Sequence, residues 1–317
     1  MRRIIALFAA AALFGAAACN SSNGTPSTPG QPDNVNVGVI AIVDVAPIYL
    51  GKQQGFFSKR NINLTLTTAQ GGAAIVPAVV SGQYQFGFSN TVSLLLAAQN
   101  GLPLKVVCNG NNSTGMADAD FAGLFVKADS PIKSPKELVG KTVAANTLKN
   151  IVEISVRDSV KKDGGDAAGV KFAELPFPDQ LPALQAGRVD AIFVVEPFQA
   201  AAIAAGARKI ASSYVDAAPN LTVAMYFTSN QLRTSNPGLV TRFTEAMKES
   251  LAYADTHPDE VRTVLGTYTQ ITAEVRAKLT LPKWPAEIDK ASVQALAEHA
   301  QSYGLLTKQP DIAALLP

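Results

Sequence analysis

The sequence predicts an α/β protein of two lobes, each built on a mainly parallel sheet flanked by helices, with a ligand cleft between the lobes. From Val35 onward, short apolar runs alternate with helix-like segments, as in βαβ architectures. The predicted helices begin at small or hydroxyl residues, and several end at glycine, which is how helices start and stop. The roughly 280 residues after the leader suffice for one large or two modest cores.

The first 34 residues have the composition of a leader and a tether. Met1 to Arg3 is basic, residues 4–18 are an unbroken run of apolar and small residues, and Cys19 follows. This order is typical of a secretory signal peptide, and the run is shorter than the roughly 20 residues of a spanning helix. Residues 20–34 are polar and rich in Ser, Pro and Gly. We therefore expect a signal peptide over 1–18 and a flexible tether over 19–34.

Cys19 resembles the lipidated cysteine of a bacterial lipobox, because small residues precede it and a polar tether follows. The resemblance implies that Cys19 becomes the lipidated N-terminus of a lipoprotein on the extracytoplasmic face of the bacterial cell membrane. Two or three acyl chains hold a protein firmly, whereas one holds it only marginally. The alternative is a soluble secreted protein with an ordinary cleavage site.

Charge and cysteine content exclude several classes of protein. Lys and Arg number 27 against 25 Asp and Glu, and removal of Arg2 and Arg3 with the leader makes the mature chain formally neutral. A neutral chain has no basic surplus for nucleic acid. Once Cys19 is lipidated, Cys108 is the only cysteine left, so no intramolecular disulfide can form. His257 and His299 lie far from any set of Cys, Asp or Glu at metal-ligand spacing, and we expect neither a metal nor a cofactor.

The first lobe is expected over residues 35–122 and again over 220–317. Its strands are predicted at 35–42, 62–69, 84–89, 104–110 and 220–229, and its helices at 46–57, 73–82, 90–101 and, from Pro237 onward, through most of the remaining chain. The second lobe is expected over 123–219. Its strands are predicted at 142–146, 170–177, 189–195 and 208–213, and its helices at 134–141, 147–164, 179–187 and 198–207.

Ligand-facing residues are expected where strands end and helices begin. Ligands of open α/β sheets bind at the carboxyl ends of strands, and a helix start offers unsatisfied N–H groups and partial positive charge. Three such places follow the first three strands of the first lobe. The candidate residues there are Asp44, Ala46, Pro47, Gly71, Gly72, Ala73, Ser89, Asn90 and Thr91. An ordinary turn is the alternative for Gly71 and Gly72.

The second lobe and the returning strand supply the other side of the predicted cleft. The candidate residues there are Asn146, Thr147, Asn150, Phe193, Glu196 and Tyr226. Asn146 or Thr147 could instead be only a helix cap. Glu196 ends a fully apolar strand, where an unpaired carboxylate is costly to bury, so it either has a structural partner or accepts hydrogen bonds from the ligand. Phe193 and Tyr226 either belong to the core or stack on a ligand ring.

The order of several phrases resembles the substrate-binding proteins of nitrate, sulfonate, taurine and thiamine-precursor ABC importers. These phrases are APIYLGKQQGFFSKRNINLTL, GGAAIVPAVVSGQYQFGFSN, SPIKSPKELVGKTVAAN, LPALQAGRVDAIFVVEPF and WPAEIDKASVQALAEHAQSYGLL. The resemblance implies a periplasmic-binding-protein type 2 fold whose lobes close over a small-molecule ligand. It also implies a monomer that delivers this ligand to an ABC importer permease.

Two alternative functions share the resemblance. One is a sensory or surface lipoprotein, and the other is an enzyme similar to thiamine-pyrimidine synthases. We expect no enzyme, because both histidines fall in the C-terminal helices and the spacing indicates no nucleophile and base pair. The ligand class stays open. Lys149 is the one basic residue at a predicted cleft position, whereas Asp44 and Glu196 favour a ligand with N–H donors over an anion.

Overall fold

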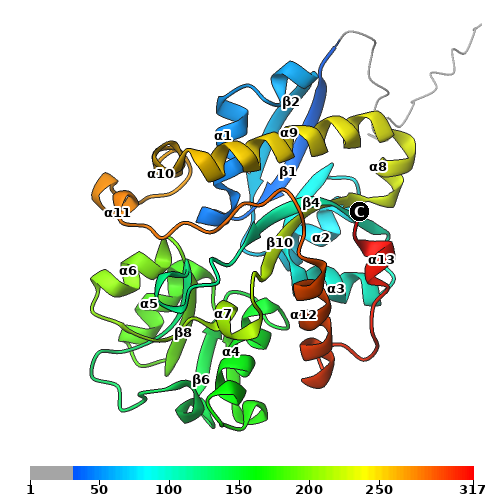
Figure 1. Cartoon of the computed structure of the whole chain (residues 1–317). Helices are drawn as coiled ribbons and strands as arrows, with labels where there is room; N and C mark the ends of the chain where they lie inside the picture. Colours follow the sequence, from blue (N-terminus) through cyan, green and yellow to red (C-terminus); the bar gives the residue numbers. More distant parts are fainter. Residues whose placement is uncertain (1–30) are drawn as a thin grey trace, which may run out of the picture.

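Two five-stranded sheets form the cores of two lobes (Figure 1). The computed structural model describes residues 31–317, so the predicted signal peptide, Cys19 and most of the tether lie outside the described residues. In the first sheet the strand order is β2-β1-β3-β10-β4, and in the second it is β7-β6-β8-β5-β9. Among residues 31–317, no helix combines the length and the apolar character needed to cross a bilayer.

The first sheet combines strands that precede and follow the second-lobe segment of the chain. Its strands are β1 (Asp33–Val39), β2 (Ile62–Thr68), β3 (Phe86–Asn90), β4 (Leu104–Asn112) and β10 (Thr222–Ser229). β1 pairs in parallel with β2 and β3, while β10 runs antiparallel between β3 and β4. Four of the five strands therefore share one direction, and their carboxyl ends meet at one edge.

The second sheet repeats this plan with the middle of the chain. Its strands are β5 (Ala122–Val126), β6 (Thr142–Ala145), β7 (Lys171–Glu174), β8 (Ala191–Val195) and β9 (Arg208–Ala211). β6 pairs in parallel with β7 and β8, and β5 runs antiparallel between β8 and β9. The predicted class, two lobes with mainly parallel sheets, is therefore confirmed, and each sheet carries one strand of opposite direction.

Helices cover both sheets. The helices of the first lobe are α1 (Ala46–Gln53), α2 (Gly72–Val80), α3 (Thr91–Gln99), α8 (Asn230–Ser235), α9 (Pro237–Thr256), α10 (Pro258–Leu265), α11 (Ala273–Ala277), α12 (Lys290–Ser302) and α13 (Ile312–Leu315). Those of the second lobe are α4 (Ile151–Lys162), α5 (Phe177–Gln185), α6 (Phe198–Ala204) and α7 (Ser213–Ala217). Short 3-10 turns are η1 (Val43–Val45), η2 (Ser58–Arg60), η3 (Ala117–Ala119), η4 (Pro135–Leu138) and η5 (Ala167–Gly169).

Several predicted boundaries differ from the structure by a few residues, and two of these differences have clear local reasons. The first strand ends at Val39 rather than Ile42, because the chain bends and then forms η1. The long helix of the second lobe begins at Ile151 rather than near Thr147. Its start is fixed by Asn150, whose side chain accepts a hydrogen bond from the N–H of Val152. Such capping satisfies a donor that the first helical turn leaves free.

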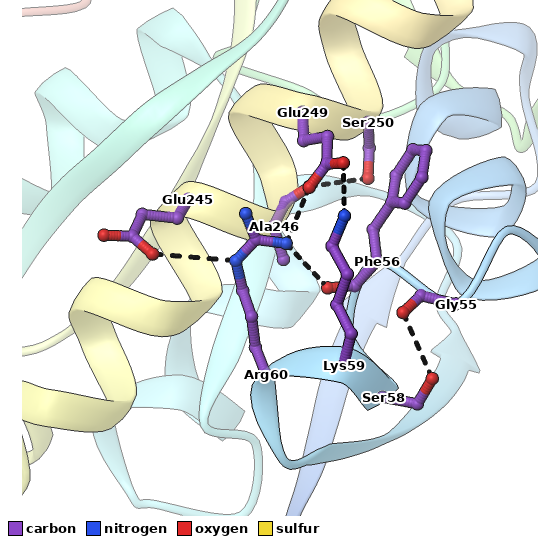
Figure 2. Close-up of polar contacts among 9 residues, drawn as sticks. All are labelled: Gly55, Phe56, Ser58, Lys59, Arg60, Glu245, Ala246, Glu249 and Ser250. Atoms are coloured by element: carbon purple, nitrogen blue, oxygen red, sulfur yellow. Dashed lines mark hydrogen bonds and ion pairs between the residues drawn. The ribbon is translucent and has the colours of Figure 1, made fainter.

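The long helix α9 is fixed to the N-terminal part of the first lobe. Figure 2 shows Lys59 and Arg60, beside the end of α1, reaching the α9 carboxylates. Arg60 donates to Glu249 at 2.6 Å and lies 3.6 Å from Glu245, and Lys59 pairs with Glu249. The ring of Phe243 in α9 also stacks on the ring of Phe86 in β3, with ring centroids 3.7 Å apart. Because exposed ion pairs contribute little, the apolar contact supplies most of the stabilisation.

The chain crosses between the lobes twice, over residues 113–121 and 218–221. The N–H of Ser113 donates to the carbonyl of Leu221 at 2.9 Å, so the two crossing segments lie side by side. Lys283, in the segment that leads to α12, forms a β-bridge with Asn112 at the end of β4. The two crossing segments, with the Lys283 segment of the first lobe beside them, are the natural place for a hinge.

Candidate functional site

A small cavity of about 30 Å³ lies between the lobes. Its first-lobe lining comes from the carboxyl edge of the first sheet and consists of Ile40, Ile42, Asp44, Phe88, Asn90, Val223 and Ala224. Its second-lobe lining consists of Asn146, Asn150, Ile151, Phe177, Val195 and Tyr214. The volume is about that of two water molecules, since one needs roughly 10–15 Å³ measured in this way. Four predicted residues, Asp44, Asn90, Asn146 and Asn150, are therefore brought together here.

Asp44 lies in η1, directly after the bend that follows β1. Its side chain is buried, with 2% of the residue exposed. Oδ1 accepts a hydrogen bond from Nδ2 of Asn111 at 3.0 Å, whereas Oδ2 has no hydrogen-bond partner among residues 31–317. Trp284 donates its indole N–H to the Asp44 carbonyl at 3.1 Å and fixes the turn. Burial raises the pKa of Asp44 to about 7, because desolvation disfavours the charged form.

Two asparagines bring helix N-termini to the cavity. Asn90 caps α3 by accepting a hydrogen bond from Ser93 N–H at 2.9 Å. The same oxygen accepts a longer bond of 3.4 Å from Ile151 N–H, at the start of α4 in the other lobe. Asn150 caps α4 and donates its Nδ2 to Oδ1 of Asn146 at 2.9 Å. The starts of α3 and α4 therefore meet across the cleft.

The Gly71–Gly72 pair forms the start of α2. Gly71 is the N-cap, and a Cβ there would lie 2.7 Å from Cγ2 of Thr147 in the second lobe. A Cβ on Gly72 would lie 2.3 Å from Oγ of Ser89 within the first lobe. Gly71 therefore permits contact between the lobes, whereas Gly72 permits packing within one of them. Ser89 is buried, and its Oγ has no partner in the described part of the chain.

Six other predicted residues lie elsewhere. Ala46 and Pro47 are buried in the first turn of α1, and Ala73 is exposed on α2. The hydroxyl of Thr91 donates to the backbone carbonyl of Thr222 in β10 at 2.7 Å. The remaining two, Phe193 and Tyr226, are fully buried in the cores of β8 and β10, where each packs against other aromatic rings.

Glu196 follows β8 but is directed at α6 and the C-terminal segment. Oε2 accepts from the N–H of Ala200 at 3.0 Å, and Oε1 accepts from Gln199 and from the N–H of Thr280, both at 3.3 Å. Both oxygens are therefore partnered, and the residue is 2% exposed. Burial raises the pKa of Glu196 even though its hydrogen bonds lower it. This geometry matches the structural alternative, a helix cap that also touches the first lobe.

Sequence reasoning missed Asn111 and Tyr214. Asn111 belongs to a run of asparagines at the end of β4, all buried: Asn109, Asn111 and Asn112. Amides at the carboxyl end of a strand are the signal that could have identified this site, since buried polar groups need partners. Tyr214 lies on α7, a helix that the sequence did not predict. Burial raises the pKa of Tyr214 well above the usual value.

A larger hollow of about 570 Å³ lies on the second lobe alone, between η3, α4, β9 and α7. Two of its carboxylates have hydrogen-bond partners in the protein. Asp216 accepts from Ser159 at 2.8 Å and from Lys162 at 2.7 Å, and Asp163 accepts from the Lys136 N–H at 3.0 Å. The cavity between the lobes is therefore the better candidate, because it combines residues of both lobes with a buried unpartnered oxygen.

The fold has clear counterparts among solved structures. The alkanesulfonate-binding protein SsuA from Xanthomonas axonopodis pv. citri, bound to MOPS, matches with a TM-score of 0.75 at 18% identity, over 90% of this chain and 99% of that chain. The periplasmic nitrate-binding protein NrtA from Synechocystis PCC 6803 matches with a TM-score of 0.73 at 14% identity, over 90% and 86%. At these identities the likeness defines the fold, which is the periplasmic-binding-protein type 2 fold.

The family follows from the sequence comparisons. The NMT1/THI5 like family matches residues 42–261, which is more than half of the chain, and the protein belongs to this family. A taurine-binding periplasmic protein of Escherichia coli (strain K12) is 27% identical over 168 residues, which are 53% of this chain and 50% of that protein. The match thus spans about half the length of this curated relative.

Proposed function

We propose that the protein is an extracytoplasmic solute-binding protein that captures a small polar molecule between its lobes and delivers it to an ABC importer. The observation that carries this proposal is the cavity lined by both lobes, with Asp44 on one side and Asn146, Asn150 and Tyr214 on the other. A mostly apolar cavity with a few converging polar groups is typical of small-molecule sites. The related and similar proteins are named as binding proteins for taurine, alkanesulfonate and nitrate, which supports the same role.

Closure of the lobes is the proposed means of capture. A ligand that touches both lobes favours the closed arrangement by its higher affinity for that state. Contacts already join the lobes around the cavity, including Asn90 with Ile151, and the N–H of Val43 with the carbonyl of Glu196 at 3.0 Å. The cavity of about 30 Å³ is small, so entry of a larger ligand requires the lobes to separate.

A thermal-shift screen combined with small-angle scattering tests the proposal. A ligand that binds only the native state raises the melting temperature by mass action. We expect at least one small amine, heterocycle, sulfonate or nitrate to raise it and to reduce the radius of gyration at saturation. Binding with an unchanged scattering profile would argue against closure. No binding by any of these classes would argue against solute capture itself.

Lipid anchoring at Cys19 is the second part of the proposal. The small residues before Cys19 and the polar tether after it support acylation on the outer side of the membrane. We expect Cys19→Ser expressed in a bacterium to leave the membrane fraction and to lose metabolic acyl labelling. Cys108→Ala is the matched control, because Cys108 is buried in β4 and its loss should leave labelling intact. Unchanged membrane association of Cys19→Ser would refute the anchor.

A further inference from the structure

Some polar side chains at and near the cavity have hydrogen-bond partners in the protein, whereas others have none among the described residues. Among the described residues that line it, Asp44 carries the only side chain that is charged at neutral pH when unperturbed, and the rest are amides, a phenol and apolar groups. Oδ2 of Asp44 is buried without a partner among residues 31–317, and so is Oδ1 of the neighbouring Asn111. Of these two acceptors, Oδ2 of Asp44 belongs to a residue that lines the cavity, and it is left for a donor.

The two helix starts that reach the cavity, those of α3 and α4, are already capped by side-chain amides, whereas the start of α2 has no side-chain cap and does not line the cavity. At the start of α3, the N–H of Ser93 donates to the side-chain oxygen of Asn90. At the start of α4, the N–H of Ile151 donates to the same oxygen of Asn90, and the N–H of Val152 donates to the side-chain oxygen of Asn150. Helix N-termini bind anions through these same free N–H groups. With their donors capped by the protein's own amides, they offer less to a sulfonate or nitrate.

We infer that the ligand is a small molecule with an N–H donor group, such as an amine, an amidine or an amino-substituted heterocycle, and that this group donates to Oδ2 of Asp44. The inference rests on the proposed function and specifies its ligand class. A donor at this position satisfies an oxygen whose burial alone is unfavourable. The amide of Asn111 holds the carboxyl and the indole of Trp284 holds the backbone carbonyl of Asp44, so little ordering is required on binding.

The pH dependence of affinity separates this ligand class from an anion. The pKa of Asp44 is raised to about 7 by burial, and a cationic donor favours the ionised carboxylate. Affinity for an amine should therefore increase as the pH rises through about 7, with release of a proton. An anion bound to the protonated acid would show the opposite trend. The titratable groups that act on Asp44 or feel its charge are Asp120, Tyr214, Tyr226 and Tyr268.

Of these groups, Asp120 needs a control. It is buried like Asp44, its pKa is raised by burial, and one of its oxygens also has no partner within residues 31–317. Its other oxygen accepts from Ser113 and Thr114 at 2.8–3.0 Å, and it does not line the cavity. Asp120→Asn thus removes a comparable carboxyl while leaving the proposed ligand contact intact.

The experiment compares probes with and without an N–H donor. Propylamine and aminopyrimidine form the donor set, and ethanesulfonate, nitrate and pyrimidine form the donor-free set. Melting temperatures are screened first, and calorimetric titrations follow for wild type, Asp44→Asn and Asp120→Asn. We expect a donor probe to bind, with affinity reduced about ten- to a hundredfold in Asp44→Asn and less than about threefold in Asp120→Asn.

Each other outcome is decisive. Binding of donor-free probes alone, with equal or higher affinity in Asp44→Asn, would overturn the inference and leave solute capture standing. Binding by neither set would count against the proposed function as well. If Asp44→Asn does not fold, the pH dependence of wild-type affinity decides the question. An amine whose affinity decreases as the pH rises through about 7 would overturn the inference.

Discussion

His299 of α12 and Asp158 of α4 join the two lobes, with Nδ1 of the imidazole 2.8 Å from Oδ2 of the carboxylate. The hydroxyl of Tyr303, one turn further along, donates to Oδ1 of Asp158 at 2.7 Å. Figure 1 shows α12 of the first lobe beside α4 of the second. The Asp158 side chain is 8% exposed, and that of His299 is 38% exposed. This polar contact holds the lobes together outside the cavity, so it can affect closure without touching the ligand.

We predict that this contact weakens as the pH rises. The hydrogen bond with Asp158 raises the pKa of His299 above the roughly 6.5 of free imidazole. The stability gained is therefore fully present below about pH 6.5 and is lost as the pH rises through the folded-state pKa. Lys161 lowers this pKa and Glu298 raises it. Because the imidazole is partly exposed, we expect an effect of less than about 1 kcal/mol.

Thermal melts of His299→Gln against wild type measure the effect. The difference in melting temperature should be largest at acidic pH and should shrink as the pH rises. His257→Gln is the matched control, because its imidazole stacks on Tyr253 within the first lobe, with ring centroids 3.7 Å apart. A difference for His299→Gln that is constant with pH would contradict the prediction.

A second prediction concerns the approach of the lobes at Gly71. Its backbone is extended (φ −172°), so alanine is tolerated by the backbone, but its Cβ would lie 2.7 Å from Cγ2 of Thr147. Gly71→Ala should therefore hinder closure. We expect weaker ligand binding and a larger ligand-bound radius in small-angle scattering, with little change in the melting temperature of the ligand-free protein.

A compensating variant makes this test specific. Thr147→Ser removes the methyl group that clashes and keeps the hydroxyl that accepts a hydrogen bond from Asn150 at 2.9 Å. Affinity and compaction should recover in the Gly71→Ala/Thr147→Ser double variant. Gly72→Ala should behave differently, because its Cβ would meet Ser89 inside the first lobe, and stability should fall instead. Failure of Thr147→Ser to rescue would show that the steric account is wrong.

The fold could be predicted because local signals agree along most of the chain. The glycines that directly follow three helix C-caps, Gly55, Gly82 and Gly101, all have positive φ, which glycine adopts without strain, and these glycines were visible in the sequence. The strands are short apolar runs between such signals. The sequence did not show that β10 inserts between β3 and β4, because strand order depends on contacts between distant segments.

The candidate site was predicted only in part, for a related reason. Asp44, Asn90, Asn146 and Asn150 follow strands, and the sheet topology brings strand ends together. The exact direction of a side chain is not a local property. Glu196 leaves its strand at the same edge, yet its carboxylate turns towards α6, because free N–H groups there offer hydrogen bonds.

A third prediction concerns the packing of α1 on α9. A Cβ on Gly51 would lie 1.8 Å from Oγ and 2.7 Å from Cβ of Ser250. Gly51→Ala should therefore destabilise the first lobe by about 1–3 kcal/mol, the usual cost of overpacking. Denaturant unfolding measures this loss, and Glu249→Ala at the exposed ion pairs of the same helix serves as the control, with a smaller effect. Equal stability of Gly51→Ala and wild type would contradict the close packing.

The last prediction concerns Glu196. Its carboxylate accepts hydrogen bonds from the N–H of Ala200 at 3.0 Å and from the N–H of Thr280 at 3.3 Å. Glu196→Gln replaces one accepting oxygen by an NH₂ group, which cannot accept from a backbone N–H. We therefore expect a loss of about 1–3 kcal/mol in the free energy of unfolding and a lower melting temperature, with affinity for the ligand close to that of wild type. Thermal melts and calorimetric titration of this variant measure the two quantities separately.

Asp44→Asn is the matched comparison for Glu196→Gln, since both remove a carboxylate that is 2% exposed at the carboxyl end of a strand. The two variants should behave in opposite ways, because both oxygens of Glu196 have protein partners while one oxygen of Asp44 has none within residues 31–317. Reduced affinity with an unchanged melting temperature in Glu196→Gln would show that its carboxylate turns to the ligand when the lobes close.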